Sequence, residues 1–96
     1  MHYKHPLPTA LRLKAAGFAE FATGGAQATV QLQDGRLFPQ ALISNGSAII
    51  ALRGYAELPF AVTQIADLFQ SEADLNPDQR GGWHYWDTWQ SPQRDE

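Results

Sequence analysis

Two dipeptides constrain the fold of this chain more than any other feature of its sequence. Asp34-Gly35 and Asn45-Gly46 are both favoured in two-residue β-hairpin loops, because a type I′ turn needs a positive φ at both central residues. Residues 27–33, which lead into the first dipeptide, alternate between apolar and polar side chains as a half-buried strand does. The sequence therefore predicts an antiparallel three-stranded meander around these two turns.

Counting outward from each turn predicts which residues face each other in the meander. Two-residue loops pair Ala28 with Ala41 across the first turn, and Ala41 with Ile50 across the second. Both registers place the same apolar residues on one face of the sheet, and a slip of one residue would scatter them. The residues of this predicted face are Ala28, Val30, Leu32, Leu37, Ala41, Ile43, Ile50 and Leu52.

The opposite face and Pro39 are the two irregular features of the predicted meander. Proline has no N–H to donate inside a central strand, so we expect a bulge or bend at Pro39, with a shifted pairing beyond it. The opposite face carries Phe38, Leu42 and Ile49, of which the last two should lie directly opposite each other. We expect these side chains to be covered by barrel closure, by the N-terminal segment, by the C-terminal tail or by another subunit.

The segments that flank the meander fit more than one element. Residues 10–22 alternate as a strand but also show helical spacing; the central Gly17 disfavours a helix, so we predict a strand. Residues 58–70 fit either a short helix, or one helical turn at 62–65 followed by a strand at 66–70.

These elements predict a mainly β fold. It is a small antiparallel meander, extended into a partly closed five-stranded barrel that resembles SH3-like barrels in element order alone. The alternative is an α+β fold with one or two helices against the three-stranded meander. Along the chain we predict an N-terminal arm (1–8), a small β domain (9–70), an acidic, glycine-bearing linker (71–82) and an extended aromatic tail (83–96).

The tail contains all three tryptophans of the chain. Trp83, Trp86 and Trp89 recur at every third position, with Tyr85 among them. Large rings with a polar group are enriched at interface hot spots, and they also stack on sugars and bases. Two interpretations stay open, namely a contact strip for a partner or ligand, and a cover that folds back over the domain's own apolar patch.

Several kinds of active or metal site have no support in the sequence. The chain has no cysteine, which excludes disulfides, thiolate catalysis and cysteine-ligated metals. The acidic spacing that begins at Asp74 lacks the glycine and glutamate of a calcium loop, and we expect its carboxylates to be solvated. No serine, histidine and acid are grouped locally. We therefore predict no enzyme, no catalytic residue, no metal and no cofactor.

Charge and length limit the partners that we expect. Residues 37–96 hold eight acids and three arginines, which disfavours nucleic acid. With 96 residues, no apolar run that could span a membrane and no signal-like start, we expect one soluble cytoplasmic domain.

The predicted function is a non-enzymatic interaction module that binds a protein partner or itself, as a homo-oligomer, through its β domain and aromatic tail. The alternative is a sugar- or nucleoside-binding domain with the tail as a lid. The predicted interaction residues are Phe38, Leu42, Ile49, Trp83, Tyr85, Trp86 and Trp89.

Overall fold

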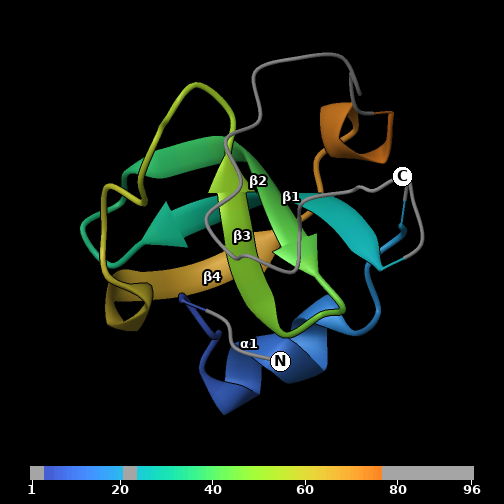
Figure 1. Cartoon of the computed structure of the whole chain (residues 1–96), viewed down its shortest axis with the longest axis horizontal. Coiled ribbons are helices and arrows are strands. Elements are labelled where there is room, and N and C mark those ends of the chain that lie inside the picture. The colour runs from blue at the N-terminus through green and yellow to red at the C-terminus, as the bar shows by residue number, and fades with distance from the viewer. Residues whose placement is uncertain (1–3, 21–23, 77–96) are drawn as a thin grey trace.

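An open four-stranded antiparallel sheet with one short helix makes up the part of the chain that the computed structural model describes, residues 4–20 and 24–76. The strand order is β3-β2-β1-β4 (Figure 1). The elements are α1 (Thr9–Ala15), β1 (Gly25–Leu32), β2 (Leu37–Ser44), β3 (Ala48–Leu52), η1 (Val62–Gln64), β4 (Ile65–Phe69) and η2 (Ala73–Leu75), where η is a 3₁₀ turn. The mainly β prediction is confirmed, whereas the described residues do not form the predicted five-stranded barrel.

The strand predicted for residues 10–22 is wrong over its described part, residues 10–20, and this part therefore adds no fifth strand to the sheet. Helix α1 begins directly after Pro8 and ends at Ala15. Gly17 therefore lies beyond the helix, so the cost of a mid-helix glycine, on which the strand prediction rested, is never incurred. Of the two interpretations of residues 58–70, the turn followed by a strand is the observed one, as η1 and β4.

The first hairpin turn is wider than predicted. Gly35 N–H donates to Leu32 O and Leu32 N–H donates to Arg36 O, each at 2.9 Å, so the loop has three residues. Gly35 has a φ of +92°, while Asp34 keeps a negative φ. The turn is therefore a type I turn closed by a left-handed glycine, and the predicted type I′ geometry is wrong here.

The irregularity predicted at Pro39 is a β-bulge. Pro39 and Gln40 together lie opposite a single residue of β1, and Gln40 has a φ of +62°. The extra residue in the bulge of β2 offsets the extra residue in the turn on the β1 side. Ala28 consequently pairs with Ala41 as predicted, although the pairing between the turn and the bulge is shifted by one residue.

The shifted pairing exchanges the faces of two side chains in β2. Phe38 lies opposite the buried Val30 and packs against the core. Leu37 lies opposite Gln31 on the other face and is 56% exposed. The prediction that Leu37 joins the core and Phe38 points away from it is therefore wrong.

The second turn has the predicted type I′ conformation. Asn45 and Gly46 have φ values of +53° and +64°, and Ser47 N–H donates to Ser44 O at 2.8 Å. The ladder closes one residue later than predicted, because Ser44 pairs with Ala48.

Because the ladder closes one residue later, Ile49 and Ile50 of β3 exchange faces. Ile49 pairs with Ile43 and faces the core, while Ile50 lies on the opposite face, which is the reverse of the prediction. The predicted pair of Leu42 and Ile49 is also wrong, because Leu42 lies opposite Ala51.

The core lies on one face of the sheet, called the core face here, and the opposite side is called the back face. Leu7 and Ala15 bring the N-terminal segment and α1 into the core, and Phe60 brings in the loop before η1. Leu7 N–H donates to Ser47 O, and Ile49 N–H donates to His5 O, so residues 5–7 lie along the edge of β3. No helix within residues 4–20 and 24–76 is long and apolar enough to cross a membrane.

Candidate functional site

Three rings and one guanidinium form a cluster that runs from the core to the surface. We call it the aromatic corner: Arg36, Phe38, Tyr55 and Phe60. The Phe38 ring lies with its centroid 4.9 Å from that of Phe60, and Tyr55 approaches it edge-on at 6.1 Å. Arg36 Cζ lies 5.8 Å from the same ring centroid. Phe60 is buried while Tyr55 is 41% exposed, so the corner presents an aromatic surface on a packed base.

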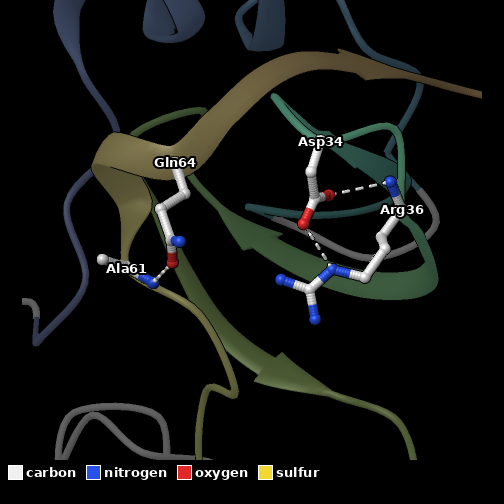
Figure 2. Close-up of polar contacts among 4 residues, drawn as sticks. All are labelled: Asp34, Arg36, Ala61 and Gln64. Atoms are coloured by element: carbon white, nitrogen blue, oxygen red, sulfur yellow. Dashed lines mark hydrogen bonds and ion pairs between the residues drawn. The ribbon is translucent and has the colours of Figure 1, made fainter.

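Local hydrogen bonds fix both sides of the aromatic corner (Figure 2). Asp34 accepts from Arg36 Nε at 2.8 Å and from the Arg36 backbone N–H at 3.1 Å. The backbone N–H bond from Arg36 is the main cause that lowers the pKa of Asp34, and the side-chain bond adds to it. Ala61 N–H donates to Gln64 Oε1 at 2.8 Å, which fixes the backbone directly after Phe60.

Tyr55 reaches the corner through a tight turn at the end of β3. Tyr55 N–H donates to Leu52 O at 2.9 Å, and Gly54 between them has a φ of +88°. A side chain at Gly54 would be strained in that conformation. The turn therefore folds Tyr55 back beside the Phe38 ring.

A buried carboxylate on the back face ties the end of the described chain to β1. We call it the polar latch: Gln27, Thr29, Ser71 and Asp74. Asp74 is 3% exposed and accepts from Gln27 Nε2 at 2.9 Å and Thr29 Oγ1 at 2.8 Å. It also accepts from the backbone N–H of Ser71 at 2.9 Å and from Ser71 Oγ at 3.0 Å. Four donors thus compensate the burial of one carboxylate.

Beside the polar latch, the back face carries a small apolar cluster. We call it the back-face patch: Leu42, Ala48, Ile50 and Ala51. All four residues are between 0 and 4% exposed. Two buried polar residues pair with residues of the patch, Gln27 of β1 with Leu42 and Ser44 of β2 with Ala48. Neither Gln27 Oε1 nor Ser44 Oγ has a hydrogen-bond partner among the described residues. The patch is therefore apolar at its centre with unused polar atoms at its border.

The outer edge of β4 is blocked by a charged pair. Lys14 Nζ lies 2.6 Å from Asp67 Oδ1, and the same oxygen accepts the backbone N–H of Leu68 at 2.8 Å. The bond from Lys14 is the main cause that lowers the pKa of Asp67. Because the carboxylate occupies an edge N–H, this edge is a poor template for an added strand.

The structure describes three of the predicted interaction residues, and it places them on both faces of the sheet. Phe38 belongs to the aromatic corner, Ile49 lies in the core, and Leu42 lies on the back face. Sequence reasoning missed Tyr55 and Asp74. A pairing that placed Phe38 on the core face could have identified Tyr55, whereas Asp74 sits in a stretch whose composition predicts solvated acids. The other predicted residues, Trp83, Tyr85, Trp86 and Trp89, lie outside the described residues.

Within residues 4–20 and 24–76, no group of three or more histidines and acids is placed to hold a metal ion. Comparison with protein-family models, with curated proteins and with solved structures gave no match.

Proposed function

We propose that this chain is a non-enzymatic interaction module, and that the aromatic corner is the surface with which it binds a second copy of itself. One observation carries the proposal: the exposed Tyr55 ring packs against Phe38 in a T-shaped arrangement while the Arg36 guanidinium lies over the Phe38 ring. Tyrosine and arginine are the residues most enriched at interface hot spots, together with tryptophan. The corner presents both on a base that is already packed.

The side chains of the aromatic corner are already held in place, which favours binding because they have little conformational entropy left to lose. Asp34 holds Arg36 by two hydrogen bonds, and Phe60 supports Phe38 from the core side. Immobilising a flexible side chain at an interface costs roughly 0.5–1.5 kcal/mol, so a pre-ordered corner avoids part of that cost.

Charge favours a second copy as the occupant. Asp34 and Arg36 are adjacent opposite charges, and both side chains are more than half exposed. In a two-fold symmetric dimer the same surface meets itself, so the acid of one copy can pair with the base of the other. The corner is thus self-complementary in charge as well as in its apolar character.

The test is sedimentation velocity over a concentration series, with wild type, Tyr55→Ser and Leu13→Ser. Leu13 is an exposed leucine on α1 and serves as the matched control. We expect the wild type to dimerise with increasing concentration, and Tyr55→Ser to weaken the dimer by roughly 10³-fold, because a hot spot of about 2 kcal/mol is lost in each of the two copies. Leu13→Ser should dimerise as the wild type does.

A wild type that stays monomeric throughout the series would overturn the proposal, as would a Tyr55→Ser variant that dimerises normally. The alternative function, a sugar- or nucleoside-binding domain, is tested in the same samples. A saturable change in aromatic fluorescence with a sugar or nucleoside, in a monomeric protein, would replace the interaction module with that function.

A further inference from the structure

We infer that, in the self-associated protein, Arg36 of each copy pairs with Glu57 of the other, so that two reciprocal ion pairs fix how the aromatic corners meet. This inference rests on the proposed function and deepens it, because it names the charged contact that determines which partner the corner accepts. It also assigns a role to Glu57, which is not one of the four residues of the corner.

The first argument is that Arg36 has hydrogen-bond donors to spare. Its Nε donates to Asp34, and its Cζ lies 5.8 Å from the centroid of the Phe38 ring. Neither terminal nitrogen of Arg36 has a hydrogen-bond partner among the described residues, and Figure 2 shows both beyond the bond to Asp34. A guanidinium held in this way presents a planar pair of donors that matches a carboxylate.

The second argument is the position of Glu57 in the chain. It lies in the loop between Tyr55 and Phe60, and both of these rings contact Phe38. Glu57 follows Tyr55 by two residues, so the two Cα atoms are within about 7 Å of each other. Leu58, the next residue, packs against the core. Glu57 therefore borders the aromatic corner on a loop that is anchored to the core.

The third argument is that the Glu57 carboxylate has no partner within its own copy. Glu57 is exposed, and it forms no hydrogen bond or ion pair in the part of the chain that the structure describes. Asp34, by contrast, already accepts two hydrogen bonds from Arg36. Of these two acids, Glu57 is therefore the one available to the arginine of a second copy.

The fourth argument is two-fold symmetry. In a symmetric dimer each contact between two different residues occurs twice, so one pair of Arg36 and Glu57 implies a second. Opposite charges that meet twice favour this orientation, whereas a partner with an acid in place of the arginine is repelled. The aromatic rings thus supply contact area, and the two ion pairs select a second copy as the partner.

The test is sedimentation velocity of Glu57→Arg and Arg36→Glu, each alone and mixed in equal amounts. One exposed ion pair changes an affinity by up to about five-fold, so the loss of two pairs should weaken each variant's dimer by roughly thirty-fold. The mixture restores both pairs, one with its charges reversed, so we expect a heterodimer within a few-fold of the wild-type affinity. Glu72→Arg is the matched control, since Glu72 is an exposed acid directly before η2, and it should dimerise as the wild type does.

Far-UV circular dichroism shows whether each variant retains its sheet. Arg36→Gln replaces Arg36→Glu if that variant unfolds, because its mixture with Glu57→Arg still restores one ion pair. A Glu57→Arg variant that dimerises normally would overturn the inference, as would a mixture that binds no more tightly than its components. So would rescue of Arg36→Glu by Asp34→Lys in place of Glu57→Arg, which would make Asp34 the acceptor.

These outcomes are distinguishable from failure of the proposed function. In each of them the wild type still dimerises, and its dimer still depends on Tyr55. A monomeric wild type overturns both the proposed function and this inference.

Discussion

The adjacent residues Ile49 and Ile50 are equally buried, but they lie on opposite faces of the sheet, and these faces are closed in different ways. On the core face, Ile49 packs with residues brought in by α1, by Leu7 and by the loop at Phe60. On the back face, its neighbour Ile50 belongs to a small apolar cluster beside a hydrogen-bonded carboxylate. The core face is closed by apolar packing, whereas the described contacts of the back face include a buried carboxylate held by four hydrogen-bond donors.

The largest expected effect is a difference in stability between alanine substitutions at Ile49 and Ile50, which are adjacent and lie on opposite faces. Ile49→Ala should destabilise the domain by about 2–5 kcal/mol, because it leaves a cavity in the core. Ile50→Ala should cost about 2 kcal/mol, the lower end of that range, because Ile50 belongs to a cluster of four residues whereas Ile49 lies in the larger core. Urea unfolding followed by both circular dichroism and tryptophan emission measures the two costs.

In Ile49→Ala we expect the two optical transitions to move together to lower urea. In Ile50→Ala the same transitions should move to lower urea by a smaller amount. Equal costs in both variants would remove the distinction between the two faces.

The next effect concerns the polar latch. Asp74→Ala should cost about 2 kcal/mol, because it leaves the buried donors of Gln27 and Thr29 without an acceptor. Asp74→Asn should cost less than about 1 kcal/mol, since the Gln27 amide can rotate and accept from the new Asn N–H through Oε1, which is unpartnered among the described residues. Hydrogen exchange of residues 71–76 and thermal unfolding provide the measurement. An Asn variant as unstable as the Ala variant would count against this account of the latch.

A smaller effect tests the bulge that turns Phe38 toward the core face. Gln40 has a φ of +62°, a conformation that asparagine tolerates and a β-branched residue does not. Gln40→Val should therefore be about 1–2 kcal/mol less stable than Gln40→Asn in urea unfolding. Equal stabilities would mean that this residue is not held in the left-handed conformation in solution.

The smallest effect comes from the pair of Lys14 and Asp67, both nearly half exposed. The folded chain has a lowered Asp67 pKa, so the pair adds stability above the ordinary value of about 3.9 and loses it as the pH falls through the lowered pKa. Asp67→Asn should cost about 0.5 kcal/mol at neutral pH, with the difference shrinking in acid. Urea unfolding at several pH values checks the sign, which a difference growing toward low pH would contradict.

Local sequence signals predicted the sheet well where turn chemistry and alternation agree. Asn45-Gly46 forms the predicted type I′ turn, and Pro39 marks the predicted bulge. The far pairing of Ala28 with Ala41 was also correct, because the wider first turn and the bulge offset each other. The two shifts cancel for the pairs beyond the bulge. Between the turn and the bulge the pairing is shifted by one residue, so Phe38 and Leu37 were assigned to the wrong faces.

The remaining errors arose where tertiary contacts decide between similar local patterns. In β3, one residue of delay after the turn exchanged Ile49 with Ile50. Along residues 10–22, docking of Ala15 on the core accompanies a helix that alternation alone could not distinguish from a strand. The buried Asp74 owes its position to donors on a distant strand, which no local composition can reveal.

The most direct test of the central claim is an isotope-filtered nuclear Overhauser experiment on the full chain. One sample is uniformly labelled, and a second mixes labelled with unlabelled copies. At concentrations where the chain self-associates, we predict intermolecular contacts in the mixed sample between the ring protons of Tyr55 in one copy and the aromatic corner of the other. A mixed sample without intermolecular contacts to Tyr55 would contradict self-association through the aromatic corner.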